Sequence, residues 1–158
     1  MSGRIGPRVL FVCLGNICRS TMAQQVVGTE LERAGVAARV DSAGLSREEA
    51  GNPLDPRAAR CLRSHGYPVG SHRARQVGRD DLDAELIIAM EAGQLDELIA
   101  LGADPARCHL LTDFIEGRQG TDTPDPWYGG AAEFESTFAT IRAASARIVT
   151  AVREVAHR

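Results

Sequence analysis

One segment near the start of the chain constrains its fold more than any other. The run Arg8-Val-Leu-Phe-Val-Cys13 is rich in β-branched and aromatic residues, which predicts a buried strand. The turn 14–16 interrupts it, and Ser20 and Thr21 can cap the helix expected next. A second strand is expected over residues 36–42. The order strand, turn, helix, strand is a βαβ unit, which predicts a parallel sheet with right-handed crossovers.

The rest of the chain continues this alternation. Pro56 can open a helix that ends near Gly66, and Leu86-Ile-Ile-Ala-Met90 predicts a third buried strand. We therefore predict a doubly wound α/β fold, with one four-stranded parallel sheet and helices on both faces, as a single domain over residues 1–158. The remaining expected segments are a short strand or extended connection at 72–75, a helix at 92–101, a strand at 108–111, a long loop at 114–128 and a last helix from 131 onward.

Composition excludes several classes of protein. Hydrophobic residues make up 44% of the 158 residues and charged residues 25%, which argues against a disordered chain or a coiled-coil rod. The net charge of −3, without a basic patch, gives no expectation of nucleic-acid or membrane-surface binding. No apolar run approaches the roughly 18 to 20 residues of a membrane span, and the first one is too short for a signal-peptide core. The cytoplasm is the expected compartment.

The cysteines and basic residues also limit the chemistry. None of Cys13, Cys18, Cys61 and Cys108 forms the C-x2-C pair typical of zinc sites. Cys61 and His65 lie one helical turn apart, but so do many unrelated residues, so no metal site is predicted. All 18 basic residues are arginine, which excludes a Schiff-base lysine and a phosphate-loop lysine.

The turn after the first strand has the residues of an anion site. A loop that opens a helix points its N–H groups inward, and the helix adds the positive end of its dipole. Gly15 lets the backbone approach a ligand closely, Asn16 tolerates a left-handed conformation, and Arg19 can bind two phosphate oxygens. Cys13 is expected at the bottom of this loop, where the same groups stabilise a thiolate. The pattern indicates a nucleophile directed at phosphorus.

Loss of a phenolate from phosphorus requires a proton from a general acid. Asp125 is our candidate, because it lies in Pro124-Asp-Pro-Trp-Tyr128 between two prolines that stiffen the chain. Asp-Pro pairs are also common in ordinary turns. Spacing alone leaves Asp113, Glu116 and Asp122 as other acids.

These motifs resemble those of a known family. The stretch from Val12 to Ser20, Val-Cys-Leu-Gly-Asn-Ile-Cys-Arg-Ser, resembles the signature loop of the low-molecular-weight protein tyrosine phosphatases, and Asp125-Pro-Trp-Tyr128 is similar to their acid loop. The resemblance covers nearly the whole chain and implies hydrolysis of phosphotyrosine and other aryl phosphate monoesters without a metal or organic cofactor. Further matching stretches, in the same order, are Asp41-Ser-Ala-Gly44, Asp55-Pro-Arg57, His72-Arg-Ala-Arg-Gln76 and Ala89-Met90.

The resemblance also implies the role of each catalytic residue. Cys13 attacks phosphorus and forms a cysteinyl-phosphate. Asp125 protonates the leaving phenol and then acts as the base for the hydrolytic water. Arg19 and the backbone N–H groups of its loop hold the phosphate oxygens. The implied phosphate-binding residues are Leu14, Gly15, Asn16, Ile17, Cys18 and Arg19.

Other residues are implied to support this site. Ser20 donates to the thiolate, and Ser42 and His72 brace the loop together with Asn16. Cys18 is suited to a reversible disulfide with the nucleophile. Trp127 and Tyr128 are expected to flank the entrance and contact the substrate ring.

Three positions depart from the family pattern. Thr21 stands where proline is usual, and Gln24 where glutamate is usual. Glu48 lies near the place of an aromatic residue that stacks on the substrate in many members, and the neighbouring Arg47 could attract acidic residues beside a phosphotyrosine.

Two alternatives to a phosphatase follow from these observations. A thioredoxin-coupled arsenate reductase uses a similar loop, but it needs two further cysteines close together, whereas Cys61 and Cys108 are far apart in the sequence. A phosphotyrosine-binding protein without turnover is the other alternative. The expected partner is a tyrosine-phosphorylated protein, such as a cognate tyrosine kinase, and neither a nucleic acid nor a membrane is expected as a partner.

Overall fold

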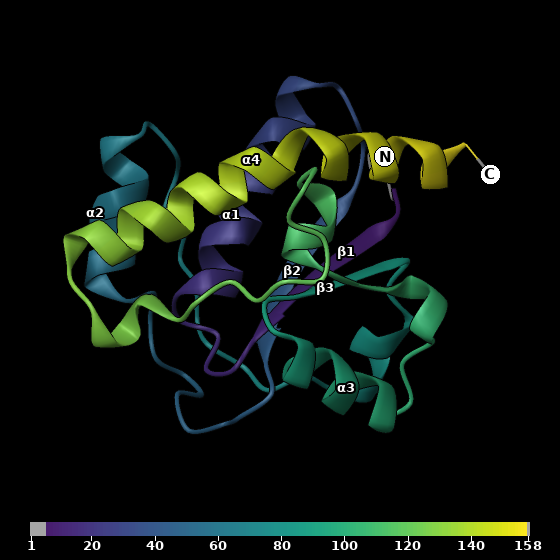
Figure 1. Cartoon of the computed structure of the whole chain (residues 1–158), viewed down its shortest axis with the longest axis horizontal. Helices are drawn as coiled ribbons and strands as arrows, with labels where there is room; N and C mark the ends of the chain where they lie inside the picture. The colour runs from purple at the N-terminus through teal and green to yellow at the C-terminus, as the bar shows by residue number, and fades with distance from the viewer. Residues whose placement is uncertain (1–5, 158) are drawn as a thin grey trace.

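The computed structural model describes residues 6–157, in which helices pack on both faces of a four-stranded parallel sheet (Figure 1). The sheet order is β2-β1-β3-β4, so the first strand lies in the interior. The strands are β1 (Arg8–Cys13), β2 (Arg39–Gly44), β3 (Leu86–Ala89) and β4 (Cys108–Leu110), and the α-helices are α1 (Arg19–Arg33), α2 (Pro56–Ser64), α3 (Ala92–Ala100) and α4 (Ala131–Ala156).

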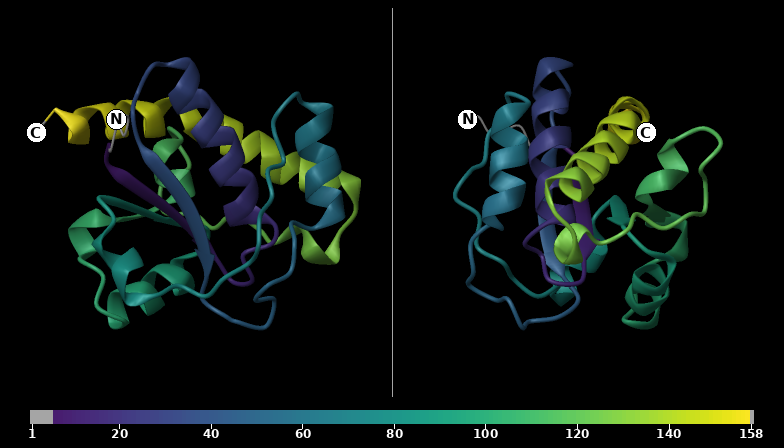
Figure 2. Two further views of the ribbon diagram at one scale, coloured as in Figure 1. Left: turned by 180° about the vertical axis from the view of Figure 1, so that it is seen from behind. Right: turned by 60° about the vertical axis from the view of Figure 1, so that its left-hand side comes forward.

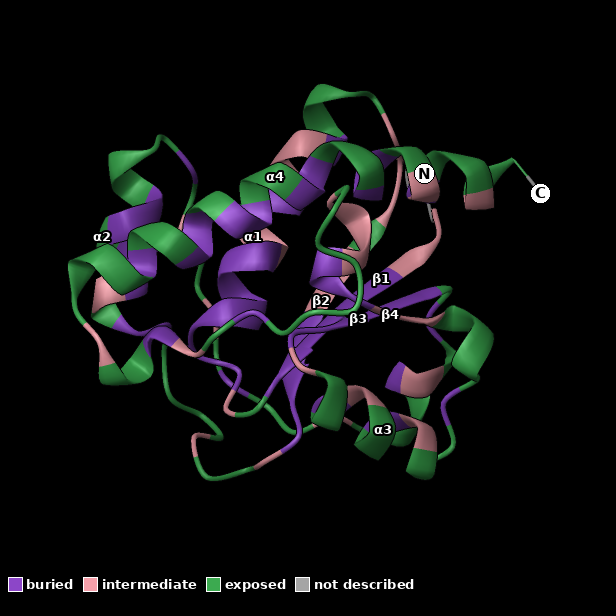
Figure 3. Ribbon diagram, in the orientation of Figure 1, coloured by how far each residue is buried: buried purple, intermediate pink, exposed green. Residues whose placement is uncertain are grey.

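Alternate side chains of β1 pack into two separate hydrophobic cores, one on each face of the sheet. Val9 and Phe11 pack on the face covered by α1, α2 and α4, whereas Leu10 and Val12 pack with Leu98 of α3 on the opposite face. Figure 1 shows α1, α2 and α4 on one side of the sheet and α3 on the other, and Figure 2 shows the same layers from two further sides. Figure 3 shows burial concentrated in the sheet and on the inward sides of the helices. Burial on both faces explains why β1 reads as a continuous apolar run.

The strand order also locates a crevice. The chain leaves β1 toward β2 on one side and later returns to form β3 on the other side. Ligands of doubly wound proteins bind at such a switch point, beyond the carboxyl ends of the strands. The loops after Cys13 and Ala89 therefore meet at one edge of the sheet.

The predicted fold and the order of its elements are confirmed, with local differences. The prediction that Ser20 and Thr21 cap α1 is wrong: the N-cap is Cys18, without a side-chain cap bond, and the helix begins at Arg19. Both hydroxyls instead bond to residues of the preceding loop, because the loop turns tightly into the helix. Within the described residues, no helix is long and apolar enough to cross a membrane.

The connections contain more structure than the sequence predicted. Residues 72–75 form an extended connection, and a single parallel bridge then joins Gly44 to Gln76. The second strand begins at Arg39, three residues later than expected. The described residues also form four short 3-10 helices that the sequence did not reveal: η1 (Arg79–Asp83), η2 (Pro105–Arg107), η3 (Leu111–Phe114) and η4 (Pro126–Tyr128).

Candidate active site

The loop after β1 is shaped by one residue in a left-handed conformation. Asn16 has a φ of 60°, as its residue type suggested, and its N–H group points at the Sγ atom of Cys13 over 3.3 Å. The Asn16 side chain accepts from the backbone N–H of Arg75 (3.0 Å) and donates to Oγ of Ser20 (3.0 Å). Asn16 is fully buried, so this single side chain fixes the loop to a distant segment and to the first turn of α1.

The sulfur of Cys13 receives a second hydrogen bond from a hydroxyl. Oγ of Ser20 lies 3.1 Å from Sγ of Cys13. Since this oxygen already accepts a hydrogen bond from the side-chain amide of Asn16, the hydroxyl hydrogen of Ser20 is free to point at the sulfur. Two donors, the N–H of Asn16 and the hydroxyl of Ser20, are therefore directed at this one sulfur.

The carbonyl of Asn16 anchors the other side of the loop. It accepts from Nε2 of His72 (2.6 Å) and from the hydroxyl of Thr21 (3.2 Å). Burial lowers the pKa of His72, so the ring holds the loop as a neutral donor through Nε2–H. Thr21 thus supplies a loop contact that a proline at this position could not make.

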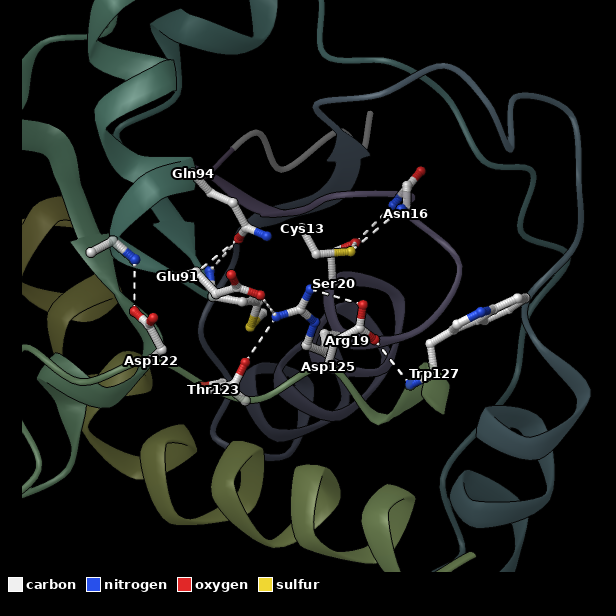
Figure 4. Close-up of polar contacts among 12 residues, drawn as sticks. Cys13, Asn16, Arg19, Ser20, Glu91, Gln94, Asp122, Thr123, Asp125 and Trp127 are labelled. Atoms are coloured by element: carbon white, nitrogen blue, oxygen red, sulfur yellow. Dashed lines mark hydrogen bonds and ion pairs between the residues drawn. The ribbon is translucent and has the colours of Figure 1, made fainter. Parts of the chain in front are cut away.

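Arg19 connects three loops at the floor of the site (Figure 4). Its side chain is only 2% exposed, and Nη1 donates to the carboxylate of Glu91 and to the carbonyl of Thr123 (2.8 Å). Nη2 lies 3.5 Å from Oδ2 of Asp125. These bonds orient the planar guanidinium, which prepares the rest of its fork for a bidentate anion.

Glu91 is a site residue that the sequence analysis missed. It directly precedes α3, at the carboxyl end of β3, where the strand order places the crevice. The side-chain oxygen of Gln94 accepts from the N–H groups of Met90 (3.2 Å) and Glu91 (3.1 Å), which fixes the turn. The position just after a predicted buried strand was the available signal.

Asp125 stands at the N-cap of η4. Its Oδ1 accepts from the N–H of Trp127 (3.0 Å), which leaves Oδ2 directed toward Arg19. Arg57 holds η4 in place, because its Nη1 donates to the carbonyl oxygens of Trp127 and Gly129, each at a distance of 3.1 Å. The guanidinium of Arg57 also lies over the Trp127 ring, 5.2 Å from its centre.

The carboxylate of Asp55 orients Arg57 in turn. Asp55 caps α2 and binds the guanidinium through both oxygens, at 3.2 Å from Nε and 3.0 Å from Nη2. Burial alone would raise the pKa of Asp55, but the hydrogen bonds from Arg57 outweigh it and hold the pKa below its usual range. Asp55 therefore orients Arg57, and Arg57 in turn holds η4, which fixes the position of Asp125.

The three other acids lie outside the pocket and bond elsewhere. Asp122 accepts from the N–H of Ala92 (2.8 Å), and Asp113 accepts from two backbone N–H groups. Glu116 lies 3.5 Å from Arg147 on the surface. Of these four candidate acids, Asp125 is the one that lines the pocket above Cys13.

One pocket brings together Cys13, Arg19 and Asp125. Its outer wall is apolar and exposed, with Leu14 53%, Trp127 42% and Tyr128 91% exposed. The pocket is lined by Cys13, Leu14, Gly15, Ile17, Cys18, Arg19, Ser46, Glu48, Glu49, Asp125, Trp127 and Tyr128.

Two predicted site residues have further properties. Cys18 lines the pocket beside Cys13, and burial, reinforced by the nearby Asp55 carboxylate, raises the pKa of the Cys18 thiol well above its ordinary range.

Ser42 bonds to Gln24 rather than to the loop after β1, because its Oγ donates to the side-chain oxygen of Gln24 (2.6 Å). The same amide donates to the carbonyl of Val40 (3.3 Å), a double role that a glutamate could not fill while ionised.

Comparisons with known proteins match the chain to one family. The family model for low molecular weight phosphotyrosine protein phosphatase matches residues 8–157. Low molecular weight protein-tyrosine phosphatase A of Mycobacterium tuberculosis is 44% identical over 141 residues, which is 86% of this chain and 85% of that protein. The corresponding phosphatase of Streptomyces coelicolor is 40% identical over 155 residues, 93% of this chain and 94% of its own.

A solved structure gives the same answer for the fold. The crystal structure of a protein tyrosine phosphatase from Entamoeba histolytica, with Hepes in its active site, superposes with a TM-score of 0.88. It is 28% identical and covers 94% of this chain and 98% of its own. The chain therefore belongs to the low molecular weight phosphotyrosine protein phosphatase family.

Proposed function

We propose that the protein hydrolyses phosphotyrosine in proteins, through a cysteinyl-phosphate on Cys13 and with Asp125 as general acid and base. The observation that carries this proposal is the meeting of Cys13, Arg19 and Asp125 in one pocket. A nucleophile, an anion-binding cation and a proton donor are the three groups that the reaction requires.

In the first step, the thiolate of Cys13 attacks phosphorus and the bond from phosphorus to the phenolic oxygen breaks. Arg19 and the inward N–H groups of the loop hold the equatorial oxygens, where negative charge is concentrated. Asp125 gives its proton to the departing oxygen, so the product leaves as a neutral phenol.

In the second step, a water molecule attacks the phosphorus of the cysteinyl-phosphate. Asp125, now ionised, takes a proton from that water, the bond from sulfur to phosphorus breaks, and inorganic phosphate leaves. The hydrogen bonds from Ser20 and from the N–H of Asn16 stabilise the returning thiolate. The residues return to their starting protonation states, so no cofactor is consumed.

The entrance supports an aromatic phosphate ester in a protein chain as the substrate. Leu14, Trp127 and Tyr128 offer exposed apolar surface for an aromatic ring. The lining also includes the carboxylates of Glu48 and Glu49, whereas Arg47 is not part of it. We therefore propose a tyrosine-phosphorylated protein, such as a cognate tyrosine kinase, as the partner, with basic residues beside the phosphotyrosine.

A thiol nucleophile works only while it is reduced, so we propose the cytoplasm as the compartment in which the enzyme acts. The structure has Cys13, Cys18, Cys61 and Cys108 as free thiols.

The test is the hydrolysis of aryl phosphates between pH 5 and 8, with a chelator and a thiol reductant present. Cys13→Ser is expected to abolish turnover. Asp125→Asn is expected to lower kcat by about 100- to 10,000-fold, with a larger loss for phenyl phosphate than for p-nitrophenyl phosphate, because the nitrophenolate needs less protonation. Asp122→Asn is the matched control, since Asp122 is a nearby acid outside the pocket.

Each outcome distinguishes the proposal from its alternatives. A folded, reduced wild-type protein that binds a phosphotyrosine peptide without turnover would identify a binding protein. Thioredoxin-dependent reduction of arsenate that survives Asp125→Asn would identify a reductase. Equal losses in Asp125→Asn and Asp122→Asn would remove Asp125 from its role as the acid.

A further inference from the structure

Three side chains with metal-binding atoms meet outside the active-site pocket, where α2 packs against α4. Cys61 lies on α2, His65 directly follows that helix, and Glu135 lies near the start of α4. One ligand atom from each residue lies within 4.8 Å of the other two. We propose that Cys61, His65 and Glu135 bind a zinc ion that connects α2 to α4.

The donor set fits zinc better than the common hard cations. A thiolate, an imidazole nitrogen and a carboxylate oxygen are the usual zinc ligands, whereas magnesium and calcium require mostly oxygen. Tetrahedral zinc with bonds of about 2.0–2.3 Å keeps its ligand atoms about 3.3–3.8 Å apart. The ligand atoms of the three residues now lie within 4.8 Å of one another, with Glu135 oxygens 2.7 Å from Nε2 of His65 and 3.2 Å from Sγ of Cys61, so side-chain movements of about 1 Å bring them to these separations.

Packing already fixes two of the three ligands. The His65 ring stacks on Phe138, with centroids 3.9 Å apart and planes 12° apart, which directs Nε2 at Oε1 of Glu135 over 2.7 Å. Cys61 is buried, and its Sγ lies 3.6 Å from the carbonyl of Phe134 and 3.2 Å from Oε2 of Glu135. The Glu135 side chain is 49% exposed, so it provides an adjustable third ligand and leaves solvent access for a water in the fourth position.

The exchange on binding is balanced. Zinc replaces the thiol proton of Cys61, which passes to solvent, and it takes the place of the hydrogen bond between His65 and Glu135. Nε2 of His65 gives up to solvent the proton that it shares with Glu135, and Nδ1 takes up one from solvent, so that the lone pair of Nε2 binds the metal while the ring proton sits on Nδ1. One thiolate and one carboxylate then neutralise the two charges of the ion.

Two arginines lie near the cluster, and their positive charges disfavour the binding of a zinc ion. Arg57 and Arg60 line the same surface pocket as Cys61 and Glu135. The carboxylate of Asp55 neutralises Arg57, whereas the exposed Arg60 has no ion-pair partner among the described residues. Removing the charge of Arg60 should therefore tighten metal binding.

The sequence could not reveal this site. Cys61 and His65 form an i, i+4 pair of the kind that occurs on many helix faces, and Glu135 lies 70 residues beyond His65. Only the packing of α4 across α2 supplies the third ligand, so the earlier expectation of no metal site was drawn from two residues alone.

Titration of cobalt(II) into the reduced full-length protein tests the proposal. The protein should carry Cys13→Ser, so that the active-site thiolate does not bind the metal. Thiolate-bound cobalt gives a charge-transfer band in the near ultraviolet, and tetrahedral cobalt gives strong visible bands. We expect one cobalt per chain with both signals, and bleaching of the visible bands when zinc is added.

Variants then assign the ligands. Cys61→Ser should remove the charge-transfer band, and Glu135→Gln and His65→Gln should each weaken cobalt binding by at least about tenfold. Cys108→Ser is the matched control and should leave the spectrum unchanged, while Arg60→Gln should strengthen binding. Circular dichroism verifies that each variant is folded, and Glu135→Gln alters a side chain that is 49% exposed.

The proposal fails if no charge-transfer band forms, if the band survives Cys61→Ser, or if Cys108→Ser removes it. The readout is metal binding rather than turnover, and so it is independent of the proposed phosphatase mechanism.

Discussion

Replacing Gly44 with alanine should damage the active site without touching a catalytic group. Gly44 ends β2 beside Cys13, its register partner at the end of β1. A Cβ atom at Gly44 would lie 2.8 Å from the carbonyl oxygen of Leu14, 3.1 Å from the carbonyl carbon of Gly15 and 3.2 Å from Cβ of Asn16. All three atoms belong to the loop that follows β1, and two of them are backbone atoms, which cannot rotate away.

The size of the effect follows from these distances. Ordinary contact begins at 3.4 Å, so the loop must move by about 0.6 Å relative to Gly44. Overpacking of this kind costs about 1–3 kcal/mol of folding stability. A 1 Å misplacement in an active site can cost about 100-fold in rate, so a shift of this size should lower kcat/KM by about tenfold.

Urea unfolding and p-nitrophenyl phosphate hydrolysis, measured on the same preparations, test both parts. Gly28→Ala is the matched control, because Gly28 lies within α1 and a Cβ there meets nothing within 4 Å. This control should keep full activity and gain about 0.5–1 kcal/mol of stability. Wild-type activity and an unchanged unfolding midpoint in Gly44→Ala would refute the argument from close packing.

Three further predictions concern residues around the site. Arg57→Lys keeps the charge but loses the fork that joins α2 to η4, so kcat/KM for phenyl phosphate should fall by about tenfold more than for p-nitrophenyl phosphate; equal losses would contradict this. Burial would raise the pKa of Asp81, but hydrogen bonds from Arg75 outweigh burial and hold the pKa below its usual value. The ionised Asp81 therefore stabilises the folded protein fully above its unfolded-state pKa of about 3.9. This stabilisation is lost as the pH falls through the lower folded-state pKa. Asp81→Asn should therefore lower the urea midpoint at pH 7 and flatten its decline below about pH 4, and a parallel decline in both proteins would contradict this. Burial lowers the pKa of His72, so stability should fall as pH drops below an unfolded-state pKa of about 6.5, and His72→Gln should lessen that fall between about pH 7 and pH 5.5 in urea titrations.

The parts of the fold that the sequence predicted are those set by local pattern. The apolar run before Cys13, the break at Gly15 and Asn16, and the amphipathic stretch after them lie within one continuous segment. Strand, turn and helix propensities act over such lengths, so the elements and the left-handed residue could be named in advance. The starting residue of β2 could not, because strand pairing rather than propensity decides where a strand begins.

The contacts that complete the site depend instead on topology. Arg19 was predictable from its spacing to Cys13, but its partners Glu91 and Thr123 come from loops 72 and 104 residues away. No pattern near Glu91 marks it as a partner of an arginine. Once the order β2-β1-β3-β4 is known, however, the residue after β3 must face the loop after β1, because parallel strands side by side end at the same edge. The missing step was thus the order of the strands rather than the chemistry of the residues, because that order places Glu91 where its carboxylate orients the guanidinium of Arg19.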